Sequence, residues 1–154
     1  MKKLFILLLI TFNLLHAETE LSDPKPSMDN PRKIVFPLNT TDEDEINHLL
    51  SVSNNVLKFY GMDNCTIVIV CYSKGIKLLI KDKAFLGKKG FKHKDIPKRV
   101  AALMMNDVEF IACNNTMKTY NIRSSDLIED IEVVTSGVSE LVEKQLDGYT
   151  YVRP

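Results

Sequence analysis

The chain has 154 residues, 45% of them hydrophobic, with 20 basic and 20 acidic side chains. This length and apolar content suit one globular domain with a single core. The formal net charge of zero provides no electrostatic footprint for nucleic acid, so we expect no nucleic-acid partner.

The N-terminus predicts export. Residues 1–17 begin with two lysines, continue as an apolar run from Leu4 to Leu15, and end at the small residue Ala17. This arrangement is typical of a secretory signal peptide, with cleavage after Ala17. The alternative is an uncleaved membrane anchor, but the run is shorter than the roughly 20 residues that a transmembrane helix needs. We therefore expect a periplasmic protein that has no membrane segment after cleavage.

The segment that follows, residues 18–32, is polar. It contains three prolines and no apolar period. Such a composition buries too little apolar surface to order itself, so it predicts a linker or mobile arm. Residues 33–154 remain as the single domain.

Within this domain, β-rich and helical patterns alternate. Strands are predicted at residues 33–38, 65–72, 108–113, 131–136 and 149–152. Helices are predicted at residues 39–61, 74–83, 96–107, 115–122 and 137–148. Alternation over short connections is typical of a layered α/β domain with a mainly parallel sheet.

Three of these elements carry specific signals. The run at 65–72 is uniformly apolar and rich in β-branched residues, as expected of a strand buried on both faces. Gly61 is expected to end the first long helix. Two capping boxes are available for the start of that helix, Thr40 with Glu43 and Thr41 with Asp44.

The chain has three cysteines, and two of them flank one strand. Cys65 and Cys71 lie about 20 Å apart along an extended chain, which is beyond the reach of a disulfide. We expect both to be packing residues, although either can in principle meet Cys113 on a neighbouring strand. There is no C-x-x-C pair, and the two histidines beyond the signal peptide, His48 and His93, lack a metal-ligand spacing. We therefore expect no metal and no cofactor.

Cys113 differs because it ends a predicted strand and precedes a predicted helix. Reactive groups in parallel α/β sheets gather outside the carboxyl ends of the strands. The N–H groups of a helix N-terminus favour the thiolate, and Asn114, Asn115 and Thr116 can cap that helix and donate hydrogen bonds to a sulfur anion. The pattern is open to two interpretations, a reactive thiol or an inert cysteine at a strand end.

The loop at residues 84–95 is basic and contains two glycines. The candidates for substrate binding in it are Lys88, Lys89, Lys92 and His93. One interpretation is a solvated loop. The other is an electropositive flap that steers sulfur anions such as polysulfide or thiosulfate toward Cys113.

Two segments carry a resemblance to a known family. The stretches VEFIACNNTM and VVTSGVSELVEKQLDGYTYVRP resemble the DsrE/DsrF-like family, and specifically its exported members. The matching residues are Cys113, Asn115, Thr116, Gly137, Val138, Gln145, Gly148, Tyr149 and Pro154. The resemblance covers residues 33–154 and implies a three-layer α/β/α domain with a mainly parallel sheet of about five strands. It also implies assembly as a homo-oligomer, either a trimer or a hexamer.

The resemblance also suggests a function. In the sulfur-relay members, the cysteine that matches Cys113 accepts sulfane sulfur as a persulfide and passes it to a partner protein. This implies a periplasmic sulfur carrier of the sulfurtransferase type, with Cys113 as the catalytic residue and a sulfur donor and acceptor as partners. Two alternatives stay open. One is a non-enzymatic oligomeric binding protein with an unreactive structural Cys113, and the other is a thiol redox protein that pairs Cys113 with a partner's cysteine.

Overall fold

The computed structural model describes residues 19–81 and 94–154. The predicted signal peptide at 1–17 lies outside these ranges. So do Lys88, Lys89, Lys92 and His93 of the basic loop. Within the two described ranges, no helix is long and apolar enough to cross a membrane.

The centre of the domain is a five-stranded sheet. Its strands are β1 (Arg32–Leu38), β2 (Cys65–Cys71), β3 (Glu109–Cys113), β4 (Glu132–Val134) and β5 (Thr150–Tyr151). They lie in the order β4-β3-β2-β1-β5, and every pairing is parallel. The predicted α/β class and parallel sheet are confirmed.

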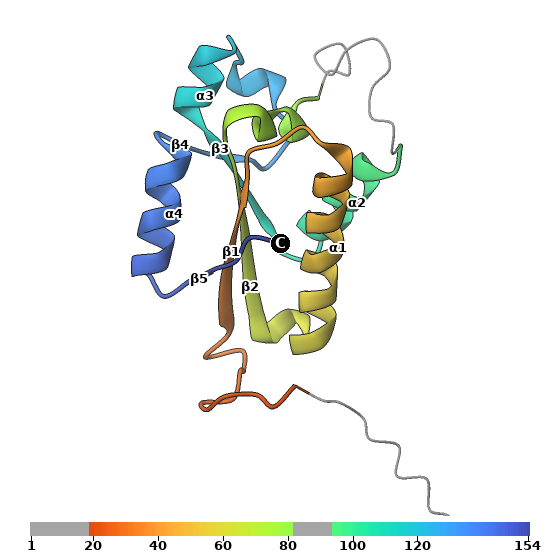
Figure 1. The fold of residues 1–154 in the computed structure, drawn as a ribbon, viewed down its shortest axis with the longest axis vertical. Helices are drawn as coiled ribbons and strands as arrows, with labels where there is room; N and C mark the ends of the chain where they lie inside the picture. The colour runs from red at the N-terminus through yellow and green to blue at the C-terminus, as the bar shows by residue number, and fades with distance from the viewer. Residues whose placement is uncertain (1–18, 82–93) are drawn as a thin grey trace, which may run out of the picture.

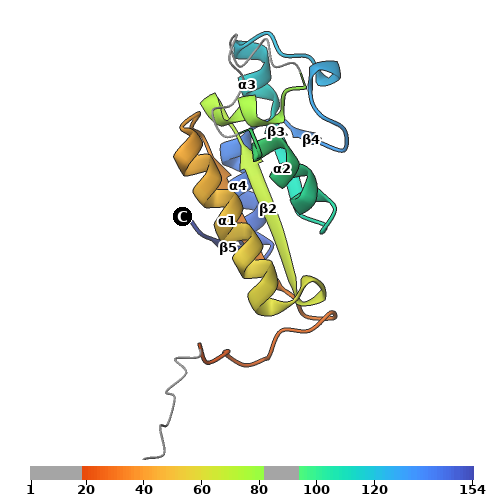
Figure 2. The ribbon, with the colours of Figure 1, turned by 90° about the vertical axis from the view of Figure 1, so that its right-hand side faces the viewer.

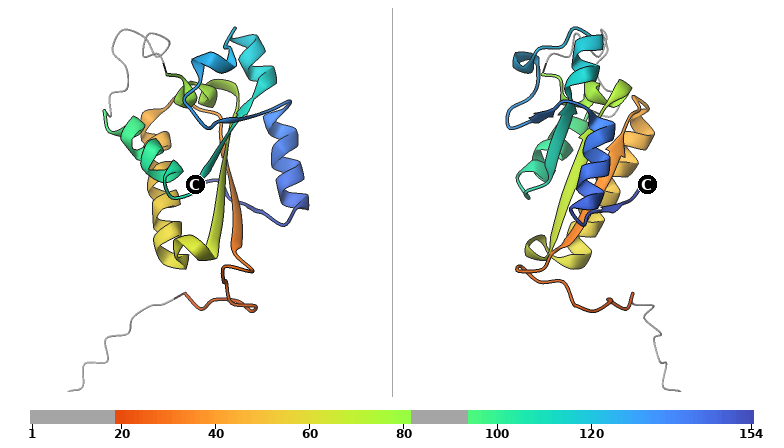
Figure 3. Two further views of the ribbon diagram at one scale, coloured as in Figure 1. Left: turned by 180° about the vertical axis from the view of Figure 1, so that it is seen from behind. Right: turned by 90° about the vertical axis from the view of Figure 1, so that its left-hand side faces the viewer.

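Helices cover both faces of this sheet (Figure 1). α1 (Glu43–Tyr60) and α2 (Ile96–Met104) cover one face, which Figure 2 shows from the front. α4 (Gly137–Leu146) covers the other face, seen in the right panel of Figure 3. The predicted three-layer arrangement is therefore confirmed, with unequal outer layers.

Two shorter helices lie over the carboxyl ends of the strands. α3 (Asn114–Thr119) follows β3 directly, and the 3-10 helix η2 (Ser73–Leu79) begins two residues after β2 ends (Figure 1). Two further 3-10 turns, η1 (Met62–Asn64) and η4 (Ser124–Asp126), connect other elements. The end of the sheet where β3 stops is thus the end where short helices begin.

Alternation along the strands divides the buried residues into two cores. The larger core lies between the sheet and the two helices α1 and α2, and includes Phe36, Ile69 and Phe110. The smaller core lies under α4 and consists of Val35, Val68, Val70, Ile111 and Leu141. β2 contributes to both cores, as its uniformly apolar sequence predicted.

The start of α1 differs from the prediction. Its N-cap is Asp42, whose carboxylate accepts hydrogen bonds from the N–H groups of Asp44 at 2.9 Å and Glu45 at 3.1 Å. Neither predicted capping box forms, because the helix begins at Glu43 and both threonines precede the cap. Thr40 instead accepts a hydrogen bond from the Asp42 N–H. The predicted end at Gly61 is confirmed, with φ of 86°.

The predicted amphipathic helix at 74–83 is a 3-10 helix that ends at Leu79. Contacts with β1 constrain its first turn. The Tyr72 N–H donates to the Leu38 carbonyl at 2.9 Å, and a Cβ added to Gly75 would lie 2.2 Å from the same oxygen. With the chain fixed this closely to the end of β1, the tighter 3-10 turn forms rather than an α-helix.

The segment before β1 runs from the amino end of the sheet (Figure 1). It contains an isolated bridge between Ser27 and Asn30. The Arg32 guanidinium donates a hydrogen bond of 2.6 Å to the Ser22 carbonyl. These local contacts join residues 19–31 to the start of β1.

Candidate active site

Cys113 is the last residue of β3, at the carboxyl edge of the sheet. Its side chain lies on the α4 face, because it shares that face with Ile111 two residues earlier and its Cβ approaches Gly137. The residue is only 5% exposed. Cys113 is therefore largely covered by its neighbours and does not project from the surface.

The sulfur of Cys113 lies between the N-termini of α3 and α4. Hydrogen bonding by the hydroxyl of Thr116 and by the backbone N–H groups of Gly137, Thr116 and Asn115 favours the charged form of the sulfur, although the Asn115 N–H also donates to the Thr135 carbonyl at 3.2 Å. Burial raises the pKa of the thiol, but these hydrogen bonds outweigh burial and hold the pKa below its ordinary value. The arrangement favours the thiolate, as the position after a strand and before a helix predicted.

Gly137 permits this geometry. A Cβ added to Gly137 would lie 3.0 Å from the Cβ of Tyr72 and 3.1 Å from the Cβ of Cys113. The missing side chain therefore allows the first turn of α4 to reach the sulfur. The Ser136 hydroxyl caps the same turn by accepting from the Ser139 N–H at 3.3 Å.

A pocket of about 340 Å³ opens over Cys113. It is lined by Tyr72, Ser73, Cys113, Asn115, Thr116, Thr119, Tyr120, Ser136 and Val138. Most of these side chains carry a hydroxyl group, and none of them is charged. The pocket thus offers hydrogen-bond donors to an anion without pairing it with a fixed cation in its wall.

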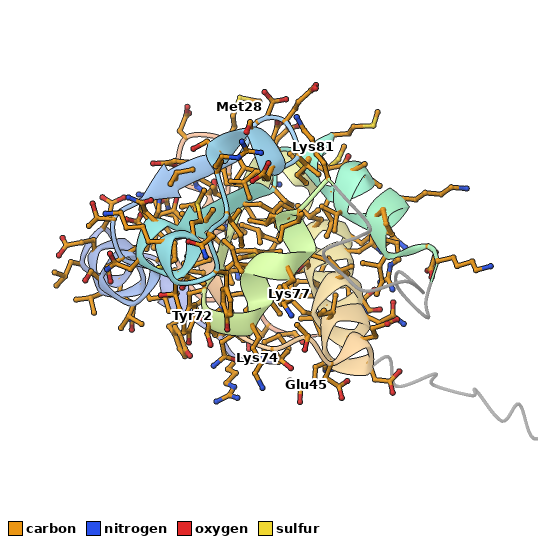
Figure 4. All side chains as sticks on the ribbon, turned by 90° about the horizontal axis from the view of Figure 1, so that it is seen from above. Met28, Glu45, Tyr72, Lys74, Lys77 and Lys81 are labelled. Carbon is orange, nitrogen blue, oxygen red and sulfur yellow. The ribbon has the colours of Figure 1, made fainter. Side chains whose placement is uncertain are left out.

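Lysines lie at the same end of the molecule, outside the pocket wall. Figure 4 looks down on this end and shows Lys74 and Lys77 on η2, with Tyr72 near them and Lys81 beyond. Lys74 and Lys81 are exposed. The end of the molecule that carries Cys113 therefore has basic side chains among the described residues, in addition to the loop candidates that lie outside them.

The structure brings together some of the predicted site residues. Asn115 and Thr116 lie with Cys113 in the lining of one pocket. Asn114 begins α3 but is not among the residues that line the pocket. The basic candidates of the loop lie outside the described residues.

The sequence interpretation missed Gly137 and Ser73 as parts of the site. A glycine at the first position of a helix is a weak signal, since a serine cap precedes it and glycine lowers helix propensity. Ser73 carries no recognisable signal, because its role depends on a contact with a residue 43 positions away.

The other two cysteines are separate from the site. Cys65, Cys71 and Cys113 are all free and buried. Cys65 and Cys71 belong to the larger core, on the sheet face opposite to Cys113, and burial raises the pKa of both thiols. The packing role predicted for them is confirmed, and the pairing with Cys113 does not form.

In the part of the chain that the structure describes, no group of acidic, histidine or cysteine side chains is arranged to hold a metal ion.

The lowered pKa of Cys113 leads to a test by alkylation. We expect the native protein to react with iodoacetamide at Cys113 alone, with a rate that rises with pH around a midpoint below about 8.5, the ordinary cysteine value. Peptide mapping across a pH series measures both site and midpoint, and Cys113→Ser is expected to abolish the labelling. A midpoint at or above the ordinary value would contradict the hydrogen-bonded thiolate.

The parallel sheet has helices on both faces, and the inner strand β3 ends in a cysteine whose pKa is lowered. These features define an α/β/α domain with one activated thiol at the carboxyl end of its sheet. The chain belongs to the DsrE/DsrF-like family, whose model matches residues 33–154. Membership is consistent with a role related to sulfur relay.

Several solved structures resemble the domain. The protein of unknown function MTH1491 from Methanobacterium thermoautotrophicum is 30% identical, with a TM-score of 0.67, over 80% of this chain and 99% of that one. The ychN protein from E. coli is 15% identical, with a TM-score of 0.61 and the same coverage, which supports the fold alone. A comparison with curated proteins gave no match.

Proposed function

We propose that this protein is an exported sulfur carrier of the sulfurtransferase type, which holds sulfane sulfur as a persulfide on Cys113. The observation that carries the proposal is the cluster of hydrogen-bond donors around the Cys113 sulfur, chiefly the Thr116 hydroxyl and the N–H groups of Gly137 and Thr116, within a pocket. Such donors stabilise a thiolate before sulfur uptake and a persulfide anion after it. Export through residues 1–17 to the periplasm is part of the same proposal.

The chemistry is a thiol exchange on sulfur. The Cys113 thiolate attacks a terminal sulfane sulfur of polysulfide, a new S–S bond forms at Cys113, and the polysulfide, shortened by one sulfur, leaves as an anion. In the second step an acceptor thiolate attacks the outer sulfur, which breaks the bond to Cys113 and restores its thiolate. Because Cys65 and Cys71 lie on the other face of the sheet, the acceptor thiol comes from another molecule.

The remaining polar groups have roles in recruitment under this proposal. Lys74 and Lys77 on η2 attract anionic sulfur donors to the pocket mouth. The proposal also keeps Lys88, Lys89, Lys92 and His93 of the basic loop, together with Asn114, as candidates for substrate binding. The hydroxyl groups of the pocket then bind the anion once it has entered.

The proposal is tested by sulfur loading followed by mass spectrometry. The mature protein is reduced, incubated with polysulfide, thiosulfate or buffer, and analysed intact and as peptides. We expect an added sulfur atom on the peptide that contains Cys113, removable by dithiothreitol and absent from Cys113→Ser. The peptides with Cys65 and Cys71 act as internal controls and stay unmodified.

The alternative is an oligomeric binding protein in which Cys113 is structural. That reading predicts that Cys113 takes up no sulfur in the native protein, although the denatured protein reacts. If this result is obtained, the sulfur-carrier proposal is wrong. A mixed disulfide with a partner protein, trapped by acid quenching and unaccompanied by sulfur loading, would instead favour the thiol redox alternative.

Self-association belongs to the same proposal, and α4 is the surface that supports it. Val138, Val142 and Leu146 recur every fourth residue and form one apolar stripe, with exposures of 57%, 49% and 77%. Val138 also lines the Cys113 pocket. We therefore place the contact between subunits of a trimer or hexamer along α4, next to the site.

This assembly has its own test. We expect the mature protein to sediment as a trimer or hexamer, and the double variant Val142→Glu with Leu146→Glu to sediment as a monomer, because two carboxylates would be buried in the contact. Met105→Glu is the matched control, since Met105 is 85% exposed at the end of α2, which covers the other face. A double variant that keeps the size of the unmodified protein would rule out this surface.

A further inference from the structure

The turn between β2 and η2 has an unusual backbone conformation at Ser73. Its φ is 49°, which is in the left-handed region. The other residues apart from glycine with positive φ in the described ranges are Asp107, Asn121 and Asp130. Aspartate and asparagine tolerate this region, whereas serine adopts it at a cost in strain, and such strain tends to occur at functional sites.

Contacts on both sides hold Ser73 in this conformation. The Gly75 N–H donates to the Tyr72 carbonyl at 3.0 Å and closes a turn in which Ser73 is the first central residue. The Tyr72 N–H is bound to the Leu38 carbonyl, and Gly75 packs directly against Leu38. The strain at Ser73 is therefore imposed by the surrounding fold.

The consequence is a hydrogen bond between distant parts of the chain. The Ser73 N–H donates to Oγ1 of Thr116 at 3.0 Å. The same Thr116 hydroxyl lies with Cys113 in the lining of the pocket, and hydrogen bonding by this hydroxyl lowers the pKa of the Cys113 thiol. A hydroxyl group has one hydrogen and rotates freely unless its lone pairs are engaged, so an N–H on one side of the oxygen directs its hydrogen to the other side.

We propose that the left-handed turn at Ser73 is a positioning element of the Cys113 site, which orients the Thr116 hydroxyl so that it donates to sulfur. Without the Ser73 N–H, a threonine hydroxyl in a helix has competing acceptors in the carbonyl groups three and four residues earlier, here those of Cys113 and Ala112. The turn prevents this alternative and keeps the donor on the sulfur. The inference deepens the proposed function, because the oriented donor serves the thiolate and the persulfide alike.

A double-mutant cycle tests the proposal, with the pH dependence of Cys113 alkylation as its readout. The variants are Ser73→Val, Thr116→Val and their combination, since a β-branched residue disfavours positive φ and valine replaces the threonine hydroxyl by a methyl group. We expect Thr116→Val to lower the rate at pH 7 about tenfold, as suits loss of a hydrogen bond to a charged group. Ser73→Val should give a loss in the same direction, and no further loss once Thr116 has been replaced.

Three further variants keep the test specific. Thr116→Ser and Ser73→Gly should restore most of the rate, because the first retains the hydroxyl and the second retains the N–H and tolerates positive φ. Asp107→Val is the matched strain control, since Asp107 has φ of 58° and precedes β3 at its amino end, away from Cys113. It should lower the melting temperature without moving the alkylation midpoint.

Several outcomes would overturn the positioning role. An equal loss from Ser73→Val with and without the Thr116→Val substitution would show that Ser73 acts independently of Thr116. A loss from Ser73→Gly as large as that from Ser73→Val would assign the effect to the serine side chain. If Ser73→Val fails to fold, an amide-to-ester substitution that removes the Ser73 N–H takes its place, and an unchanged midpoint in that protein would also overturn the proposal.

The alkylation readout is independent of sulfur loading. A protein that follows the expected cycle but takes up no sulfur would overturn the proposed function and leave the positioning role intact. A protein could instead take up sulfur on Cys113 while the effects of the Ser73 and Thr116 substitutions simply add. That result would support the proposed function and overturn the positioning role.

Discussion

Replacing Gly137 with alanine is expected to disable the Cys113 site and to destabilise the domain together. The new methyl group would lie 3.0 Å from the Tyr72 Cβ and 3.1 Å from the Cys113 Cβ, closer than ordinary contacts. The first turn of α4 must then move away and withdraw the Gly137 N–H from the sulfur. We expect the pKa of Cys113 to rise, alkylation at pH 7 to slow about tenfold, and the free energy of unfolding to fall by about 1–3 kcal/mol.

The control for this prediction is Gly148→Ala, just beyond the other end of α4. Gly148 has φ of 86° and open space around it, so alanine there strains the backbone without touching the site. We expect a stability loss of about 1–2 kcal/mol and an unchanged alkylation midpoint. Denaturant unfolding and the alkylation pH series measure the two quantities separately. If Gly137→Ala alkylates like the unmodified protein, the N-terminus of α4 does not stabilise the thiolate.

Gly75→Ala should have the largest effect on folding. Its Cβ would lie 2.2 Å from the carbonyl oxygen of Leu38 and 2.9 Å from the N atom of Asn39. Both neighbours are backbone atoms at the end of β1, so no side-chain rotation relieves the overlap. We expect a loss above about 3 kcal/mol, a large fraction of the roughly 5–15 kcal/mol that stabilises a typical domain. Thermal unfolding followed by circular dichroism measures the change.

Gly61→Ala separates the steric effect from that of backbone conformation. Gly61 has φ of 86°, but the nearest atom to an added Cβ is the Asn64 side-chain nitrogen at an ordinary 3.4 Å. The expected loss is about 1–2 kcal/mol from strain alone. A loss for Gly75→Ala no larger than this would mean that the turn before η2 relaxes easily, and that it does not hold Ser73 in its strained conformation.

The local pattern of the sequence was sufficient to predict most of the elements. The uniformly apolar run of β2 predicted a strand buried on both faces, and Gly61 predicted the end of α1, because both signals depend on near neighbours. The predicted N-cap of α1 was wrong by one or two residues, because Asp42 competes with Thr40 and Thr41 for the N–H groups of the first helical turn. The helix expected at 74–83 was also wrong in type, because its packing against Leu38 is a tertiary contact.

The candidate site was predicted only in part, for the same reason. Position in the chain was enough to select Cys113, Asn115 and Thr116, because a strand followed at once by a helix places all three at one edge of the sheet. All four basic candidates were assigned to the loop, which lies outside the described residues, whereas η2 carries Lys74 and Lys77 at the carboxyl end of the sheet.

Hydrophobic period and element order are enough to predict the α/β class, the parallel sheet and the place of Cys113 at its carboxyl edge. The atoms that surround the Cys113 sulfur depend instead on contacts between distant parts of the chain. Gly137 reaches the sulfur from a helix 24 residues later, and Ser73 reaches Thr116 from 43 residues earlier. Both contacts form because parallel strands bring their carboxyl ends to one edge of the sheet, where distances in space no longer follow distances along the chain.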